Sequence, residues 1–361
     1  MNAERVPYHD SFWKRLRRNK GAMVGLLLIL VAVFIAIFSY YLAPDSSPYA
    51  NRIVLEIGGQ KPGFKQTFLL VKNQSDYKKT NGLQRLVNGT VDKYEWVPII
   101  NYNRLKDSII VQKYIDEGVS EKITYANASL AANPIVTKKF WLGTDKYGRD
   151  ILSRLIIGTR ISLSVGIITV LISLVVGIFF GMMAGYYQGK TDQVIMWLIN
   201  VIWSIPTLLL VFAITLLLGR GFWQVFIAVG LTMWVNVARL VRGQVMVARE
   251  LQYVEAGRTL GFSDSRIMFH HILPNIFGPI MVIAASNFAS AIIIEAGLSF
   301  LGVGVQPPQP SWGLMIKENY NFIITQNPAL ALAPGFAIMI LVLAFNLLGN
   351  GLRDAVNPQT Q

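Results

Sequence analysis

Long apolar runs separated by short polar connections make up most of the chain. An α-helix needs about 20 apolar residues to cross the hydrocarbon core of a bilayer. The runs of that length cover residues 21–42, 161–185, 193–218, 222–241, 276–301 and 329–348. The pattern therefore predicts an all-α polytopic membrane protein with about six transmembrane helices.

Two of these runs have features that affect helix packing. The run 161–185 is rich in glycine, which lets a neighbouring helix approach closely in lipid. The run 193–218 is interrupted by Pro206, which removes one backbone hydrogen bond and clashes with the preceding turn. We therefore expect a closely packed second span and a third span that is kinked near Ser204 and Ile205, just before Pro206.

The segment between the first two runs has a different pattern. From residue 44 to residue 139 the apolar density falls and turn residues appear. The stretches 52–57, 67–72 and 96–100 are short, β-branched and bounded by Gly, Pro or Asn, which is typical of strands, and 108–116 fits either a strand or a short helix. We expect a small α/β or mostly β domain here, inserted outside the membrane.

Composition and charge support a membrane protein. Of the 361 residues, 53% are hydrophobic and 15% are charged. The absence of cysteine excludes a disulfide framework, a cysteine-based metal site and a thiol nucleophile. The formal charge of +13 comes from basic residues that lie beside apolar runs or are scattered through the 44–139 segment. We interpret this charge as a topology signal rather than as a nucleic-acid surface.

The basic residues also predict an orientation. A cluster from Lys14 to Lys20 precedes the first run, which is longer than the apolar region of a signal peptide and lacks a good cleavage site, so we expect a retained helix. The loops on the same side then carry further basic residues, whereas the short opposite loops carry Arg220 and Lys317. The positive-inside rule therefore places both termini in the cytoplasm.

The longest polar interruption in the second half runs from Glu255 to Asn275 and reads EAGRTLGFSDSRIMFHHILPN. It predicts a short helix that stops at Gly261, because glycine adopts the left-handed backbone at little cost. Ser263 provides N-cap chemistry for a second short helix, which we expect Pro274 to close. The predicted structure is two short helices joined at a glycine corner.

A second polar string, FWLGTDKYGRDILSRLIIGTRISL, covers residues 140–163. Its glycines alternate with charged residues, which predicts a compact turn whose charges pair locally, followed by an amphipathic stretch at 151–157. The residues of this turn that we single out are Gly143, Thr144, Asp145, Gly148, Arg149 and Asp150.

These strings resemble a known family. Residues 255–274 resemble the EAA loop of ATP-binding-cassette (ABC) import permeases, and residues 140–163 resemble the segment before the second span in the C-type subunit of dipeptide and oligopeptide importers. Residues 295–313 and 343–354 also resemble the corresponding parts of these importers. The resemblance covers residues 13–43 and 140–357, and it departs from the family in the long 44–139 segment.

The resemblance implies a type I ABC importer permease with alternating access. It implies a cytoplasmic basic N-terminus (1–20), a first transmembrane helix (21–43), an extracytoplasmic insert (44–139) and a permease core (140–357) with a coupling loop, residues 250–275, named here the EAA segment. In that family two cytoplasmic ATPases bind such loops. The residues expected to act there are Glu255, Ala256, Gly257, Gly261, Asp264, Arg266, His271 and Pro274.

The resemblance also implies partners. The chain would pair with a homologous permease subunit, as a heterodimer, and an extracytoplasmic solute-binding protein would deliver peptide substrate. ATP and Mg would be bound by the ATPase subunits, and no cofactor by this chain. A nickel complex or another small solute is an alternative substrate class, because relatives with similar loops carry those solutes.

Polar residues inside the predicted spans are candidates for a transport pathway, because each is costly when it faces lipid. They are Asn200, Ser204, Asn236, Asn287, Glu295 and Asn346. The asparagines also fit hydrogen bonds between helices. Glu295 fits a pathway residue and a carboxylate near the outer interface equally well.

Two other protein classes remain open. A self-contained secondary transporter or channel would need no ATPase partner, and we see neither inverted repeats nor several buried charges. A membrane enzyme is disfavoured, because the histidines are limited to His9, His270 and His271. Gly185 and Gly189 lack the spacing of a phosphate-binding loop. We therefore expect no catalytic residue, metal site or nucleotide site on this chain.

Overall fold

A computed structural model describes residues 12–73, 80–116, 118–219, 221–324 and 327–356. His9 and Arg220, which entered the sequence argument, lie outside these residues. The chain divides into two compact units. The first, named here the helical unit, comprises residues up to 32, 164–298 and those from 338 onward, and the second, the sheet-bearing unit, comprises 33–163 and 299–337.

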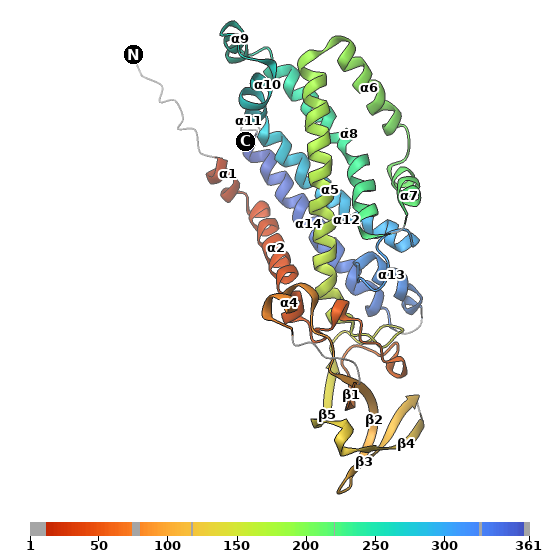
Figure 1. Cartoon of the computed structure of the whole chain (residues 1–361). Coiled ribbons are helices and arrows are strands. Elements are labelled where there is room, and N and C mark those ends of the chain that lie inside the picture. Colours follow the sequence, from red (N-terminus) through yellow and green to blue (C-terminus); the bar gives the residue numbers. More distant parts are fainter. Residues whose placement is uncertain (1–11, 74–79, 117, 220, 325–326, 357–361) are drawn as a thin grey trace. The chain divides into compact units, whose positions relative to one another are not determined.

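Five helices of the described residues are long and apolar enough to cross a membrane. They are α2 (Lys20–Ile37), α5 (Ile151–Tyr187), α8 (Phe222–Ala248), α12 (Phe277–Leu301) and α14 (Ala329–Val356) (Figure 1). The pair α6 (Gly189–Trp203) and α7 (Thr207–Leu218) makes a sixth span if the two are counted together, and it is bent by 91° at Pro206. The predicted break at Pro206 is confirmed, and its angle is far larger than that of a simple kink.

Several spans differ from the predicted bounds. Helix α5 begins at Ile151 rather than at residue 161, because the amphipathic stretch continues into the apolar run without a break. Helix α8 runs on to Ala248 and α14 to Val356, so both extend beyond the purely apolar part of the sequence. The first span breaks after Ile37, and the short helix α3 (Ser39–Leu42) follows.

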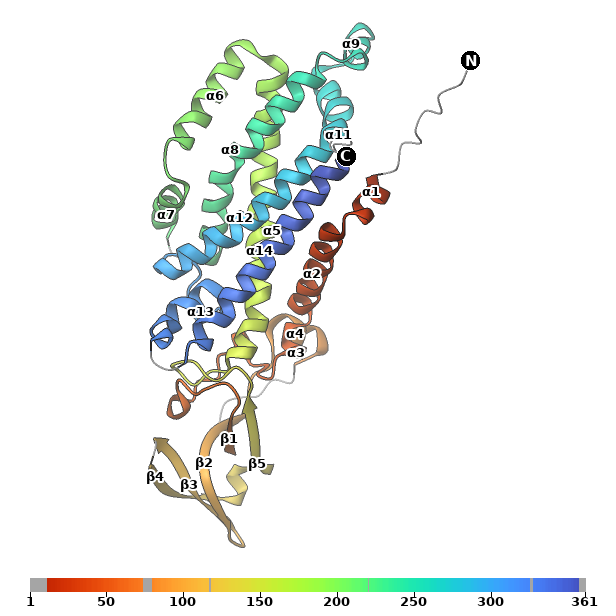
Figure 2. The same cartoon turned by 180° about the vertical axis from the view of Figure 1, so that it is seen from behind.

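Glycines fix the contact between α5 and α8 in the helical unit. Gly177, Gly181 and Gly185 occupy one face of α5, and a Cβ added at Gly177 would lie 2.5 Å from the Cβ of Val237. A Cβ at Gly185 would lie 2.7 Å from the carbonyl oxygen of Arg242. The predicted close packing of the second span is therefore confirmed, and α8 is the helix that it contacts (Figure 2).

Helices α12, α14 and α2 pack in the same unit. The rings of Phe288 on α12 and Phe345 on α14 stack with centroids 3.8 Å apart. Gly25 of α2 approaches α14 so closely that a Cβ there would lie 2.5 Å from the carbonyl oxygen of Ala344. The short helix α1 (Phe12–Arg18) precedes α2, and its Leu16 side chain is buried against this group of helices.

The sheet-bearing unit contains a five-stranded antiparallel sheet in the order β4-β3-β2-β1-β5 (Figure 1). The strands are β1 (Phe64–Lys72), β2 (Tyr94–Arg104), β3 (Ser108–Asp116), β4 (Val119–Ala126) and β5 (Leu130–Phe140). Leu69, Val97 and Val111 build the core on one face of the sheet. On the other face Phe68 and Phe140 pack together with Val54 and Ile57.

Shorter elements complete this unit. Helix α4 (Gly82–Asn88) lies between β1 and β2, and α13 (Trp312–Asn319) follows α12. The 3₁₀ turns are Pro48–Ala50, Leu55–Ile57, Asn127–Ser129 and Tyr320–Ile323.

The structure confirms some of the predicted strands and corrects one. Residues 67–72 and 96–100 lie within β1 and β2, and 108–116 is a strand rather than a helix. The predicted strand at 52–57 is wrong. Val54 donates its backbone N–H to Tyr147 at 3.1 Å, and Thr144 Oγ1 donates to the Ile57 carbonyl, so this segment closes on the 140–150 turn and forms a 3₁₀ turn. Strands β4 and β5 and helix α4 were not predicted.

Candidate functional site

The first half of the EAA segment is helix α9 (Gln252–Thr259), which ends in a Schellman motif. The backbone N–H of Phe262 donates to the Gly257 carbonyl at 3.0 Å, and that of Gly261 donates to the Arg258 carbonyl at 2.9 Å. Gly261 has a φ of +75°, in the left-handed region, and a Cβ there would meet nothing within 4 Å. The predicted glycine corner is therefore present, and backbone conformation rather than space makes glycine the suitable residue.

The second half is a continuous helical stretch with an irregular middle. The Ser263 hydroxyl accepts the backbone N–H of Arg266 at 3.4 Å and caps α10 (Asp264–Arg266). A π-helical turn (Ile267–Ile272) and α11 (Leu273–Asn275) follow. Pro274 lies in α11, and the helical stretch ends one residue later, at Asn275.

Buried apolar side chains attach the EAA segment to the ends of α5 and α8. Val254, Ile267 and Ile272 are fully buried in one cluster with Met182 and Val245. The segment is therefore held in place by packing as well as by its own caps.

Hydrogen bonds add to this anchor. The hydroxyl of Tyr186, at the end of α5, donates to Asp264 Oδ1 at 2.7 Å. Arg249 donates to the Tyr186 carbonyl at 2.6 Å. Asp264 is thus the point at which the second half of the EAA segment is tied to α5.

The opposite side of the EAA segment is exposed. Leu260 is 72% exposed and Phe269 44% exposed. Arg258, two residues before Leu260, is also exposed, and its guanidinium lies 5.2 Å from the centroid of the Tyr186 ring. Of the residues singled out from the sequence, Glu255, Ala256, Gly261, Asp264, Arg266 and Pro274 are exposed, Gly257 is buried and His271 is half-buried. A rigid element that presents apolar and basic side chains suits a partner surface that is apolar with acidic groups.

The side chain of His271 packs against other side chains of the EAA segment. Its ring stacks on Phe262 with centroids 5.5 Å apart and planes 7° apart. The guanidinium of Arg266 lies over the same phenyl ring, 4.3 Å from its centroid. These three side chains link the glycine corner to the second half of the segment.

The structure brings some of the polar span residues together. Asn200 Oδ1, on α6, accepts a hydrogen bond from Arg239 Nη2, on α8, at 3.2 Å. The Arg239 guanidinium lies 3.6 Å from the ring centroid of Trp203. Ser204 is the exposed C-cap residue of α6, and Asn236 is exposed on α8 one helical turn before Arg239. We name Asn200, Trp203, Ser204, Asn236 and Arg239 the Arg239 cluster.

The other span candidates do not join this cluster. Asn287 and Glu295 lie on α12 and are buried, with exposed fractions of 3% and 1%. Asn346 is exposed on α14. Arg239 itself was missed, because its position near the end of an apolar run made it look like a cytoplasmic flanking residue. The available signal was its spacing, since it follows the candidate Asn236 by one helical turn.

The 140–150 turn forms a compact structure with local charge pairing. Asp145 Oδ2 accepts from Arg149 Nε at 2.6 Å, which confirms the expected pairing within the turn. Gly143 and Gly148 have φ values of +81° and +73°. A Cβ at Gly143 would lie 2.2 Å from the Gln60 carbonyl oxygen, so both conformation and space require glycine there.

This turn belongs to a larger buried network. Glu318 Oε2, on α13, accepts from Arg149 Nη2 at 2.7 Å and from Arg154 Nη2 at 3.3 Å. Arg154 is 0% exposed and Asp145 is 0% exposed. We name Asp145, Arg149, Arg154 and Glu318 the buried charge network. Arg154 and Glu318 were not predicted from the sequence.

A second group of charges lies next to this network. The Asp150 carboxylate interacts with the Ser153 hydroxyl, and burial raises the pKa of Asp150 above its ordinary value. Burial lowers the pKa of Lys138, and the nearby Arg52 lowers it further. Arg52 forms a bidentate pair with Asp92, at 2.6 and 2.7 Å. Arg52 also lies 3.2 Å from Asp45 Oδ1, so this guanidinium pairs with two carboxylates of the chain.

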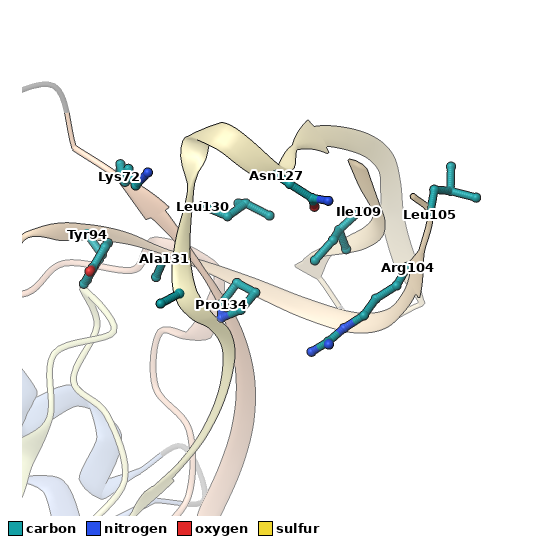
Figure 3. Close-up of a pocket in the computed structure, with 10 residues that line it drawn as sticks. Lys72, Tyr94, Arg104, Leu105, Ile109, Asn127, Leu130, Ala131 and Pro134 are labelled. Carbon is teal, nitrogen blue, oxygen red and sulfur yellow. The ribbon is translucent and has the colours of Figure 1, made fainter. Parts of the chain in front are cut away.

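The sheet also bears an open groove of about 600 Å³ (Figure 3). Its lining is apolar with a basic rim, and it comprises Lys72, Tyr94, Arg104, Leu105, Ile109, Asn127, Leu130, Ala131, Ala132 and Pro134. The Lys72 amine donates a hydrogen bond to the Ala128 carbonyl at 2.8 Å, so this amine already has a partner within the chain. Among the described residues there is no group of three or more His, Cys, Asp or Glu side chains placed to hold a metal ion.

Comparison with known families gives two matches. Residues 177–361 match the family described as "Binding-protein-dependent transport system inner membrane component". Residues 8–57 match the "N-terminal TM domain of oligopeptide transport permease C".

Similar sequences agree with these matches. The chain is 44% identical to the glutathione transport system permease protein GsiD of Pectobacterium atrosepticum, over 61% of this chain and 72% of the relative. It is 39% identical to the oligopeptide transport system permease protein OppC of Bacillus subtilis, over 97% of this chain and 90% of the relative. Among solved structures, the methionine ABC transporter MetNI in an inward-facing conformation aligns with a TM-score of 0.47 and 18% identity, over 56% of this chain and 96% of that chain.

Proposed function

Because the chain belongs to the family of binding-protein-dependent transport system inner membrane components and is an ABC importer permease, we propose that it moves peptides by alternating access, with energy from separate ATPase subunits. Relatives are named for oligopeptide, dipeptide and glutathione transport, and this supports a peptide substrate. A nickel complex or another small solute is the alternative within the same family.

The observation that carries this proposal is the EAA segment. Its inner side is tied to α5 and α8 by buried side chains, whereas Leu260 and Phe269 are exposed. A push on the exposed side is therefore passed to the ends of two long helices rather than absorbed by a loose loop. In this proposal Glu255, Ala256 and Arg266 contact an ATPase, while Gly257, Gly261, Asp264, His271 and Pro274 shape and anchor the segment.

The proposal also assigns partners. Two cytoplasmic ATPase subunits bind ATP and Mg, a homologous permease pairs with this chain as a heterodimer, and a solute-binding protein delivers the peptide outside. This chain then needs no nucleotide site of its own. The membrane is the cell inner membrane, crossed several times, with both termini on the cytoplasmic side.

This orientation follows from charge and from the position of the EAA segment. If the EAA segment is cytoplasmic, the basic helix α1 and Arg249, the C-cap residue of α8, lie on the same side, as the positive-inside rule requires. The 140–150 turn and the sheet then lie outside, where a solute-binding protein docks. The candidate pathway within the spans consists of the Arg239 cluster with Asn287, Glu295 and Asn346.

Reconstitution tests the proposal directly. The complex purified with the tagged chain is placed in proteoliposomes with the binding protein, and uptake of a labelled peptide is measured with and without ATP on the ATPase side. We expect uptake that requires ATP and the ATPases. Uptake by the chain without ATPases would instead identify a secondary transporter or channel, and uptake of a nickel complex without peptide uptake would identify the alternative substrate.

A matched pair of variants tests the role of the EAA segment. Gly261→Trp places a bulky side chain on a left-handed backbone, whereas Gly261→Asn keeps a residue that tolerates this conformation. We expect Gly261→Trp to insert into the membrane but to lose ATP-driven uptake, and Gly261→Asn to retain most of it. Normal transport by Gly261→Trp would refute the proposed coupling role.

A further inference from the structure

Arg239 is a cation that lies within α8, about 14 Å from its C-terminal end at about 1.5 Å per residue. Its guanidinium is held in place by two contacts with α6, a hydrogen bond to Asn200 at 3.2 Å and stacking on Trp203 at 3.6 Å. The side chain is half-buried, and its Nε is buried without a hydrogen-bond partner. Both of these contacts are with groups that carry no charge.

A neighbouring arginine on the same helix differs from Arg239 in having a counter-ion. Arg242, one turn further along α8, forms a bidentate pair with Asp192 at the start of α6. By contrast, no carboxylate of the described residues lies within ion-pair distance of Arg239. Within the part of the chain that the structure describes, Arg242 therefore has a counter-ion and Arg239 has none. A charge in a membrane span normally has a partner, because an uncompensated charge there is costly.

The break between α6 and α7 adjoins this cation. Trp203 is the last residue of α6, and Ser204 to Pro206 form the irregular backbone at which the two helices bend by 91°. Irregular backbone within a membrane is tolerated where it is covered by protein or lines a water-filled path. In transporters, breaks of this kind are common at substrate sites.

The polar side chains around the break are uncharged. Asn200 and Asn236 carry amide groups, which can hydrogen-bond to a solute without neutralising the guanidinium. The Ser204 hydroxyl donates to the Val201 carbonyl at 2.8 Å and can still accept a hydrogen bond. A guanidinium presents a planar fork of N–H groups that matches a carboxylate in bidentate fashion. A metal cation is repelled by the same group.

We infer that the Arg239 cluster is a contact site for a substrate carboxylate, in which Arg239 pairs with the terminal carboxylate of a peptide as it passes the α6–α7 break. This inference rests on the proposed peptide transport. It names the part of the substrate that the membrane-spanning portion recognises. It also favours peptides over metal complexes as cargo, because the site is cationic.

Two variants and a control test the inference in the reconstituted complex. Arg239→Gln removes the charge, and Asn200→Asp places a carboxylate next to Arg239 that competes with the substrate. Lys190→Gln removes one positive charge from the exposed start of α6, away from the cluster. We expect ATP-driven uptake of a labelled peptide to fall about tenfold or more in the first two variants and to be unchanged in the control.

Asn200→Asp separates substrate recognition from a structural role. If Arg239 merely clamps α6 to α8, a carboxylate at position 200 strengthens the clamp and transport is preserved, which would overturn the inference. Arg239→Lys keeps the charge without the fork, and we expect its uptake to lie between those of wild type and Arg239→Gln. Uptake equal to wild type in both Arg239 variants would also overturn the inference.

Other binding partners for Arg239 give distinct results. Loss of the second permease from purified Arg239→Gln complex would show that the charge pairs with that subunit. Wild-type uptake that requires anionic lipid, with no such requirement in Arg239→Gln, would show a lipid phosphate contact. Either result would overturn the carboxylate site while peptide transport by the wild type stood. If the wild-type complex moved no peptide at all, the proposed function and this inference would both fail.

Discussion

The buried charge network and the EAA segment use similar residues in opposite ways. In the network, Arg149 and Arg154 converge on Glu318 and Asp145, and all four side chains are removed from solvent. In the EAA segment, Arg258 and Arg266 are exposed, and the buried part of the segment is mainly apolar. Charges that the chain satisfies itself hold its fold together, whereas charges on an exposed, anchored element are available to a partner.

The largest expected effect comes from breaking the network. Glu318→Gln leaves Arg149 and Arg154 sharing one buried carboxylate, and we expect the free energy of unfolding to fall by about 3–5 kcal/mol. The measurement is the unfolding transition in detergent. The matched control is Glu121→Gln on the exposed strand β4, which should change stability by less than about 0.5 kcal/mol. Equal effects of the two substitutions would show that the network contributes no more to the free energy of unfolding than an exposed charge does.

A smaller effect is expected at the anchor of the EAA segment. Tyr186→Phe removes the hydrogen bond to Asp264 but keeps the ring, so we expect a loss of about 1.5 kcal/mol. The second half of the segment should then be less firmly attached to α5. The number of ATP molecules hydrolysed per peptide transported should therefore rise. An unchanged ratio, together with unchanged stability, would contradict the anchoring role of Tyr186.

The charges beside the network predict a pH dependence. Because burial raises the pKa of Asp150, the folded state binds a proton at this carboxylate more tightly than the unfolded state does. Stability is therefore lost as the pH rises from the unfolded-state pKa to the folded-state pKa. Asp150→Asn removes this dependence. We expect the wild type to become less stable relative to Asp150→Asn as the pH rises above about 4, the ordinary pKa of an aspartate. A difference that stayed constant with pH would argue against a raised pKa.

The smallest change in stability is expected on the exposed side of the EAA segment. Arg266 contacts the face of Phe262 and is otherwise exposed, so Arg266→Ala should shift the midpoint of thermal unfolding by less than about 2 °C. If this residue contacts an ATPase, the same variant should reduce ATP-driven uptake. A large loss of stability would place Arg266 with the structural charges instead.

Sequence patterns predicted those elements whose causes are local. Gly261, Ser263 and Pro206 act through their own backbone or their immediate neighbours, so the glycine corner, the N-cap and the broken span could be predicted. Local signals also misled, because residues 52–57 have strand composition but close on the distant 140–150 turn. Strand β4 was missed because it is an edge strand with mostly exposed side chains, and it lacks a clear apolar alternation.

The charged sites also show that sequence patterns predict local contacts but not distant ones. The pairing of Asp145 with Arg149 spans one turn and was predicted from spacing. The pairing of Arg154 with Glu318 joins residues that are 164 positions apart, and composition alone does not indicate which carboxylate meets which guanidinium. Arg239 was similarly read as a flanking charge until the contacts with Asn200 and Trp203 placed it at the α6–α7 break.

The central claim is that the EAA segment contacts an ATPase, and the absence of cysteine makes a direct test possible. Leu260→Cys introduces a single thiol at a position that is 72% exposed, and Val175→Cys introduces one at a similarly exposed position on α5, at 69%. The measurement is cross-linking from each thiol in the purified complex, with identification of the attached subunit. The account predicts that Leu260→Cys attaches to an ATPase subunit and that Val175→Cys does not. Attachment from neither position in a complex that contains ATPases, or equally from both, would contradict it.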